Sequence, residues 1–246
     1  MKYDFVYILG TGSKQNDFEI KHSIRSIVKN ANDIVKDIYI IGEKPPFFDY
    51  DKIKHIPAQD LHGVNLRNEI HKLRIACSNK KISDDFVLMN DDFFIKNPID
   101  EIAVENKGLL SESISEHTTK KGSYYNIMCK TDDLLGDDAN DFSLHTPFIY
   151  NKVKLLEITK EVQEKYRTVL LRTFYANKHQ LESNKKRGGD VKIKTTGDDS
   201  KDLQNFKNEY KKKYPYISTD DDIMNNAKVR DFIAKEFTEE YNFYEK

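Results

Sequence analysis

The first hundred residues alternate between apolar runs of strand length and segments with helical spacing, which restricts the fold more than any other feature. Tyr3–Leu9 is rich in β-branched and aromatic residues and stops at a glycine loop, Gly10-Thr-Gly-Ser13. Glu19–Lys29 has isoleucines at helical spacing with Asp17 as the expected N-cap, and Asp37–Gly42 is the next apolar run. A strand, a glycine loop, a helix and a second strand predict a βαβ unit of a parallel sheet.

The same alternation continues towards the middle of the chain. Short strands are expected at Lys54–Pro57 and Phe86–Met89, with a helix at Asn68–Ser78 between them. With 246 residues the chain can bury a full core. We therefore expect an α/β fold, in which a mostly parallel, Rossmann-related sheet is flanked by helices.

The second half of the chain has weaker signals. The pattern allows a strand at Ser123–Met128 and a helical piece near Leu203–Tyr210, and it predicts helices at Lys152–Lys165, Thr168–Lys178 and Ile223–Phe237. We expect residues 1–100 to form a ligand-binding α/β half. Residues 101–246 are expected to form a more helical half of the same continuous domain.

Two carboxylates, Asp91 and Asp92, directly follow the expected strand at Phe86–Met89, and apolar residues resume after them. Carboxylates beside an apolar strand are costly to desolvate unless a cation or a hydrogen-bond network compensates them. Ligands dock at the carboxyl ends of strands in open α/β sheets. Hard oxygen ligands favour Mg²⁺ or Mn²⁺, which bind phosphate oxygens in turn. The alternative is an ordinary β-turn, for which Asn-Asp-Asp is common composition.

The glycine loop is a second candidate site, formed by Gly10, Thr11, Gly12 and Lys14. Glycines let backbone N–H groups approach an anion, and Lys14 adds positive charge. The spacing matches neither the Walker A sequence nor the dinucleotide glycine fingerprint. The loop therefore predicts either a phosphate site or a simple tight turn.

His145 stands before Thr146-Pro147, and a proline disfavours helical backbone in the residue that precedes it. A neutral imidazole in this extended segment would complete the coordination of a cation held by Asp91 or Asp92. The alternative is a partly buried structural histidine. The other histidines have no metal-ligand spacing.

Several charged side chains on the expected helices allow a functional or a structural role. Arg25, Lys72 and Arg172 would each bind a phosphate or remain a solvated surface cation. Asp220-Asp221-Asp222 is most simply the cap of the last helix. Alternatively, Asp220 or Asp221 supplies a catalytic base.

The composition argues against several classes of protein. Lys and Arg number 40 against 41 Asp and Glu, so no overall field attracts nucleic acid or a membrane surface. Cys77 and Cys129 do not make a disulfide framework. The apolar run before Gly10 is too short for a signal peptide or a membrane span. We expect a cytoplasmic protein, in the host cytoplasm if the gene is viral.

Five segments occur in an order that resembles short glycosyltransferase-like proteins, often encoded by phages or bacteria, related to the Stealth sugar-phosphate transferases. These segments are Val6–Ser13, His22–Ile27, Ile38–Gly42, Met89–Phe94 and His145–Lys152. The resemblance spans roughly residues 3–178. The chain lacks or shortens further sequence blocks of Stealth proteins, which leaves open whether a sugar or a sugar phosphate is transferred.

The resemblance implies a nucleotide-sugar fold of the GT-A type, with residues 1–100 binding the donor and residues 101–246 on the acceptor side. It implies Asp91, Asp92 and His145 as ligands of Mn²⁺ or Mg²⁺. Gly10, Thr11, Gly12 and Lys14 would border the nucleotide, with Arg25 and Lys72 near its phosphates. The catalytic candidates are Asp92, Asp220 and Asp221.

The function expected from this resemblance is a metal-dependent glycosyltransferase that moves a sugar from a nucleotide-sugar donor, favoured as UDP-linked, to an acceptor hydroxyl. The acceptor would be a glycan or, if the gene is viral, a modified DNA base. One alternative is transfer of a sugar 1-phosphate for a surface polysaccharide. The other is a non-catalytic binding module on the same fold.

Overall fold

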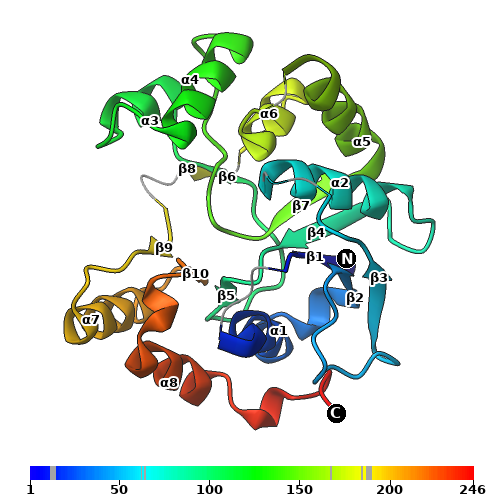
Figure 1. Ribbon diagram of the computed structural model, residues 1–246, viewed down its shortest axis with the longest axis vertical. Helices are drawn as coiled ribbons and strands as arrows, with labels where there is room; N and C mark the ends of the chain where they lie inside the picture. The colour runs from blue at the N-terminus through cyan, green and yellow to red at the C-terminus, as the bar shows by residue number, and fades with distance from the viewer. Residues whose placement is uncertain (12–14, 62, 64, 167, 184, 187–189) are drawn as a thin grey trace.

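A five-stranded sheet lies at the centre of the molecule (Figure 1). The computed structural model describes residues 1–11, 15–61, 63, 65–166, 168–183, 185–186 and 190–246. The sheet has the order β3-β2-β1-β4-β7, in which β1 to β4 are parallel and β7 is antiparallel to β4. Its strands are β1 (Tyr3–Leu9), β2 (Val35–Gly42), β3 (Ile53–Pro57), β4 (Asp85–Met89) and β7 (Phe148–Asn151).

Helices cover both faces of this sheet, so its parallel strands are apolar on both sides. Helix α1 packs on one face, while α2, α5 and α6 pack on the other (Figure 1). The helices are α1 (Phe18–Asn30), α2 (Asn65–Ser78), α3 (Leu110–Glu116), α4 (Ser123–Leu135), α5 (Lys152–Glu161), α6 (Leu171–Lys178), α7 (Asp199–Tyr210) and α8 (Ala227–Glu236). In the part of the chain that is described, none of the helices is both long and apolar enough to cross a membrane.

Helix α1 is attached to the strand after the acidic pair by a stripe of buried serines. Ser23 Oγ donates to the carbonyl oxygen of Phe93 at 2.5 Å, and Ser26 Oγ accepts from the N–H of Ile95 at 3.0 Å. Both serines are fully buried. These bonds satisfy backbone groups of β5 (Phe93–Ile95) that would otherwise be costly to bury, and they place the start of α1 against the acidic pair.

A second sheet joins distant parts of the sequence in the order β5-β10-β9, with β10 at Tyr216–Thr219 and β9 at Lys192–Ile193. Helices α7 and α8 pack on it through a separate apolar cluster that contains Phe94, Ile217 and Phe237. A two-stranded sheet joins β6 (Glu105–Asn106) to β8 (Lys185–Lys186). Strands from both halves of the chain therefore share the same sheets.

Two local predictions are wrong. Ser123–Met128 is the start of helix α4 and not a strand, because Met128 and Thr131 face inwards at helical spacing. Thr131 Oγ1 accepts from the N–H of Leu170 at 2.9 Å, which connects α4 to the segment before α6. Asp17 has a left-handed backbone (φ 58°) and its side chain does not cap α1.

Candidate active site

The candidate site lies where the strand order of the main sheet reverses. β2 and β3 continue the sheet on one side of β1, and β4 and β7 continue it on the other. Tyr7 of β1 is level with Met89 of the parallel strand β4, so the segments after both strands leave the sheet side by side. Open α/β sheets bind ligands in the crevice outside the strand ends at such a reversal.

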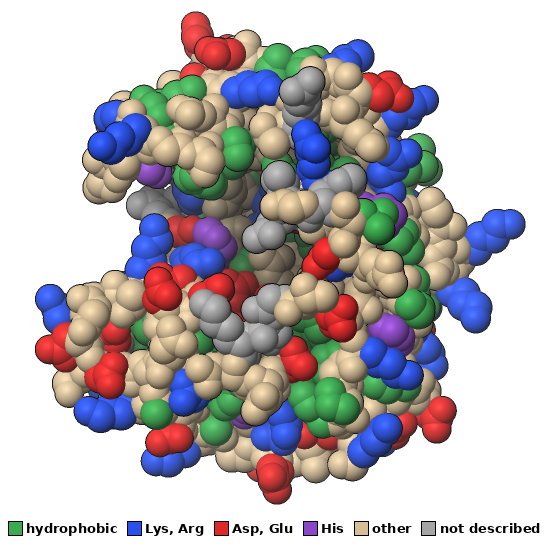
Figure 2. Space-filling view, viewed as in Figure 1, with side chains coloured by type: hydrophobic (Ala, Val, Ile, Leu, Met, Phe, Trp, Pro, Cys, Tyr) green, Lys and Arg blue, Asp and Glu red, His purple; other side chains and the backbone are tan. Residues whose placement is uncertain are grey.

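A pocket of about 430 Å³ occupies this position. We call it the acidic pocket, because its lining includes Glu19 of α1, Asp91 and Asp92 after β4, and Asp221 after β10, together with the carboxylates of Asp60 and Glu69. Figure 2 shows the face of the molecule that is hollowed, with acidic, basic and histidine side chains along the hollow. The remaining lining residues are Ile8, Gly10, Thr11, Asp60, Asn68, Glu69, Lys72, Leu88, Asn90 and Met224.

Burial and neighbouring carboxylates raise the pKa values of Asp91 and Glu19 in the acidic pocket. Burial, followed by the charges of Asp92 and Asp221, raises the pKa of Asp91 to about 7. Burial and the charges of Asp91 and Asp92 raise the pKa of Glu19 to about 8. Glu19 is only 8% exposed and accepts a hydrogen bond from Thr219 Oγ1 at 3.1 Å. The pocket therefore concentrates negative charge that protons or a cation would neutralise.

Only one of the two carboxylate oxygens of Asp92 has polar partners among the described residues. Its Oδ2 is 3.2 Å from Lys192 Nζ and accepts from Ser218 Oγ at 3.3 Å. Its Oδ1 is buried and has no hydrogen-bond partner among the described residues. Burial raises the pKa of Asp92, against the opposing charges of Lys192 and His145.

The acidic pair also satisfies the turn interpretation of Asn-Asp-Asp. The N–H of Phe93 donates to the carbonyl oxygen of Asn90 at 3.2 Å, so these residues form the turn between β4 and β5. The turn and the acidic site are thus the same structure. Within the described ranges, no group of three His, Cys, Asp or Glu side chains is arranged to hold a metal ion.

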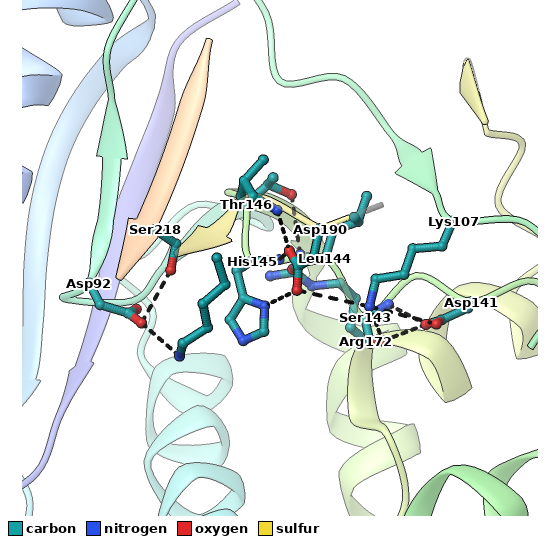
Figure 3. Close-up of polar contacts among 12 residues, drawn as sticks. Asp92, Lys107, Asp141, Ser143, Leu144, His145, Thr146, Arg172, Asp190 and Ser218 are labelled. Atoms are coloured by element: carbon teal, nitrogen blue, oxygen red, sulfur yellow. Dashed lines mark hydrogen bonds and ion pairs between the residues drawn. The ribbon is translucent and has the colours of Figure 1, made fainter. Parts of the chain in front are cut away.

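His145 lies beside the acidic pocket and is held by Asp190 (Figure 3). The backbone N–H of His145 donates to Asp190 Oδ1 at 3.0 Å, and the ring Nδ1 of His145 pairs with Asp190 Oδ2. Burial alone would raise the pKa of Asp190, but the hydrogen bonds and charge of His145, with the charge of Lys107, place it well below its usual value. Because Nδ1 pairs with Asp190, Nε2 is the ring nitrogen that could bind a metal ion or a substrate hydroxyl.

The described part of the glycine loop is attached to an Asp–Lys pair. Thr11 N–H donates to Asp60 Oδ2 at 3.2 Å, and Lys72 Nζ donates to Asp60 Oδ1 at 2.6 Å and to the Leu9 carbonyl oxygen at 2.8 Å. A Cβ at Gly10 would lie 3.2 Å from Asp60 Oδ2, so a side chain there would crowd this contact. Gly10, Thr11 and Lys72 thus line the pocket. Gly12 and Lys14 lie outside the described residues.

The other candidate residues are not all brought to the acidic pocket. Arg25 is 5% exposed and pairs with Glu245, its Nε lying 2.5 Å from Oε1. Asp220 caps the turn that precedes α8, since its Oδ1 accepts from Ile223 N–H at 2.8 Å. Arg172 donates to the Leu144 carbonyl oxygen and lines a second pocket. The structure therefore does not associate Arg25 or Asp220 with the pocket that contains Asp91 and Asp92.

The second pocket measures about 320 Å³ and adjoins the acidic pocket, because Glu69, Leu88 and Asn90 line both. His145 is one of its lining residues. The others are Leu66, Phe93, Tyr124, Ile127, Ser143, Leu144, Tyr150, Val169, Leu170, Leu171 and Arg172. We call it the apolar pocket.

The sequence interpretation missed Glu19, Asp60, Asp190 and Lys192. Only Glu19 had a usable local signal: with Ser23 and Ser26 it forms a polar stripe at helical spacing beside the isoleucines of α1. Lys192 lies 100 residues from Asp92 and Asp190 lies 45 residues from His145, so only the fold brings each pair together.

No family model and no curated protein sequence matches the chain. Among solved structures, the galactosyltransferase LgtC, in complex with donor and acceptor sugar analogues, matches with a TM-score of 0.52 and 8% identity over 95% of each chain. The apo form of the glycosyltransferase GlyE from Streptococcus pneumoniae TIGR4 matches with a TM-score of 0.44 and 10% identity, over 98% of this chain and 61% of that one.

At 8% identity the likeness to LgtC is a likeness of fold. The narrower resemblance to the Stealth proteins stays a prediction. The α/β prediction is confirmed: this chain has the fold of a GT-A glycosyltransferase, with a central, mostly parallel sheet flanked by helices.

Proposed function

We propose that the protein is a glycosyltransferase that uses a nucleotide-sugar donor and a divalent cation. The observation that carries the proposal is the convergence of Glu19, Asp91, Asp92 and Asp221 on one pocket at the strand-order reversal. The fold, which LgtC shares, agrees with this function.

The residues of the acidic pocket fit a divalent cation. Asp92 Oδ1 is buried without a hydrogen-bond partner among the described residues, and the pKa of Asp91 is raised by burial and by neighbouring negative charge. Mg²⁺ sites commonly use one or two carboxylates and complete the coordination with water and substrate phosphates. Asp91 and Asp92 would therefore hold Mn²⁺ or Mg²⁺ together with water and donor phosphates. His145 stays a proposed ligand, because the described structure does not group it with the two carboxylates as a set of three. The cation would neutralise charge on the departing diphosphate.

The neighbouring side chains would bind the donor and position it. Lys192, 3.2 Å from Asp92, supplies a positive charge next to the phosphate position. Gly10 and Thr11 would border the nucleotide, and the contacts of Lys72 and Asp60 keep this loop at the pocket.

In the proposed transfer, the acceptor hydroxyl oxygen bonds to the anomeric carbon and the bond from that carbon to the diphosphate oxygen breaks. The nucleoside diphosphate leaves, and a carboxylate takes the hydroxyl proton. We assign this base to Asp221, which lines the pocket, rather than to Asp220, which caps Ile223. In the alternative reaction, attack on phosphorus transfers the sugar 1-phosphate and releases a nucleoside monophosphate. Product analysis distinguishes the two.

A thermal-shift screen of nucleotide sugars with and without Mn²⁺ tests the proposal. A donor at a hundredfold excess over its Kd should stabilise the protein by about 2–3 kcal/mol. We expect this only with Mn²⁺, with a UDP-linked sugar the first candidate. Asp92→Asn should abolish the shift, whereas Asp138→Asn, at an exposed residue that lines neither pocket, should not. Stabilisation by no donor across the panel would favour the non-catalytic binding module.

A further inference from the structure

The side of the apolar pocket that adjoins the acidic pocket carries polar side chains, and further polar groups come from Tyr124, Tyr150 and Arg172. Asn90 follows β4, and Ser143 and His145 lie in the segment that leads into β7, so these polar side chains come from the segments next to Asp92. Asn90 also lines the acidic pocket. A hydroxyl bound between Asn90 and His145 would therefore lie at the boundary of the two pockets.

The rest of the apolar pocket comes from other elements and combines aliphatic side chains with Tyr124, Tyr150 and Arg172. Leu66 of α2, Ile127 of α4 and Leu171 of α6 contribute side chains that cannot form hydrogen bonds. Ile127 and Leu170 also belong to the small apolar cluster that joins α4 to the segment before α6. A free sugar buried against the aliphatic side chains would place hydroxyl groups against carbon, which costs free energy for each unpaired hydroxyl.

Several of these apolar side chains retain exposed surface. Leu66 and Ile127 are only partly buried, and Tyr124 is 44% exposed at the same pocket, with its hydroxyl 3.4 Å from Ser143 Oγ. The guanidinium of Arg172 is directed to the Leu144 carbonyl oxygen and packs 4.9 Å from the centre of the Phe148 ring. A ligand that covered Leu66, Ile127 and Tyr124 would remove apolar surface from water.

We propose that the apolar pocket binds the acceptor, and that this acceptor is amphipathic: a hydroxyl-bearing head at Asn90 and His145 joined to an aromatic or aliphatic tail against Leu66 and Ile127. The proposal rests on the function proposed above. The head's hydroxyl oxygen gains the bond to the donor's anomeric carbon, the diphosphate leaves, and the hydroxyl proton passes to a carboxylate of the acidic pocket. The tail does not react and supplies binding energy alone.

Three glucosides with the same head test this inference by calorimetric titration of the full chain with Mn²⁺ and UDP. We expect 4-nitrophenyl β-glucoside to bind about tenfold more tightly than methyl β-glucoside, since the nitrophenyl ring buries apolar surface. Octyl β-glucoside below its micelle concentration should share this advantage. Equal affinities for the methyl and nitrophenyl compounds would overturn the inference.

Single substitutions test whether the tail binds in the apolar pocket. Leu66→Gln and Ile127→Gln change partly buried side chains, so the fold should be retained, and each should remove most of the preference for the nitrophenyl compound. Val153→Gln is the matched control, because Val153 is 74% exposed on α5 and lines neither pocket. A preference that survives both pocket substitutions would contradict the proposal.

The failure of the two proposals can be told apart. If UDP-linked and other donors bind with Mn²⁺ but the methyl and nitrophenyl glucosides bind equally, only the acceptor inference fails. If no nucleotide sugar binds but the nitrophenyl preference persists and depends on Leu66 and Ile127, the glycosyltransferase function fails and the pocket remains an amphipathic binding site.

Discussion

Asp190 holds His145 through two bonds at once: Oδ1 accepts from the His145 backbone N–H at 3.0 Å, and Oδ2 pairs with the ring Nδ1. The two bonds fix both the position of the residue and the orientation of its imidazole. An imidazole held through Nδ1 by a carboxylate presents Nε2 to a metal ion or a substrate hydroxyl. Asp190 is thus a positioning residue for His145.

Asp190→Asn should lower the transfer rate by about 10- to 100-fold, in the range for partners that orient a metal ligand. The amide keeps the shape of the side chain but loses the negative charge that favours the Nδ1–H form of the ring. Steady-state kinetics with varied Mn²⁺ measure the effect. If His145 binds the cation, the Mn²⁺ concentration for half-maximal rate rises; if it acts on the acceptor, only kcat falls. Asp138→Asn is the exposed control, and equal rates for both variants would contradict the positioning role.

The acidic pocket should make the cation-free protein less stable as pH rises. The folded pKa of Asp91 is about 7 against an ordinary 3.8, so the folded state holds its proton more tightly than the unfolded state. The stability linked to this proton is complete below pH 3.8 and is lost as pH rises through about 7. Glu19, with a pKa of about 8, acts in the same direction.

Asp91→Asn should therefore make the free energy of unfolding decrease less as pH rises. Urea titrations at intervals between pH 4 and pH 8, in the presence of a chelator, measure this decrease. Because protons and cations compete for the same oxygens, Mn²⁺ should raise the Tm of the natural protein more at pH 8 than at pH 6. In Asp91→Asn this Mn²⁺ effect should shrink. An Mn²⁺ shift that does not depend on pH would count against carboxylate coordination.

The position of the acidic pair was predictable because the signal is local. Phe86–Met89 is an apolar strand, and Asp91 and Asp92 follow its end, so the sequence places them at the edge of a sheet where ligands bind. The βαβ order of β1, α1 and β2 was predictable for the same reason, since each element has its own periodicity.

Packing between distant segments limits two sequence predictions: the strand at Ser123–Met128, which is wrong, and the phosphate-binding role of Arg25, which stays a prediction. Tyr124, Tyr125 and Ile127 favour a strand by propensity, but burial of Met128 beside Leu110 and Leu170 stabilises a helix. Arg25 has a phosphate-binding chemistry in isolation, yet its partner Glu245 lies 220 residues away. Local composition contains no information about such contacts.

His22 should give a stability term of the opposite sign. It is 4% exposed, its Nδ1 donates to the Phe18 carbonyl oxygen at 2.8 Å, and burial lowers its pKa from 6.5 to about 4. The folded state therefore excludes a proton that the unfolded state binds below pH 6.5, and stability is lost as pH falls from 6.5 towards 4, by up to about 3 kcal/mol.

His22→Gln should remove this loss. Urea titrations at pH 7 and pH 4.5 give the difference in unfolding free energy between the variant and the natural protein. The change of this difference with pH isolates the contribution of His22, because the carboxylates contribute equally in both proteins. The variant should be less stable at pH 7, since it loses the ring contact with Phe18, and comparatively more stable at pH 4.5. A difference that is constant with pH would show that His22 is protonated equally in both states.

The pair of Arg25 and Glu245 should stabilise the end of the chain and leave the donor unaffected. Arg25 Nε and Nη2 donate to the two oxygens of Glu245 at 2.5 and 2.8 Å, and Nη1 donates to the Phe237 carbonyl oxygen at 3.2 Å. Glu245→Gln leaves the buried guanidinium without its counter-charge, and it should cost about 3 kcal/mol of stability. Lys21→Gln removes only a 30% exposed partner of the same carboxylate and should cost less than about 1 kcal/mol.

Donor affinity decides between this structural role and the phosphate-binding role that the sequence suggested for Arg25. Because Arg25 lines neither pocket, Arg25→Met and Glu245→Gln should both lower the Tm and leave the Kd of the Mn²⁺-bound nucleotide sugar unchanged. Calorimetry at a temperature where both variants are folded measures that Kd. If Arg25 binds the donor phosphates instead, Arg25→Met raises the Kd by about tenfold or more, which is typical for the loss of a charge-assisted phosphate contact. Glu245→Gln would then leave the Kd unchanged, because it frees the guanidinium to bind the donor.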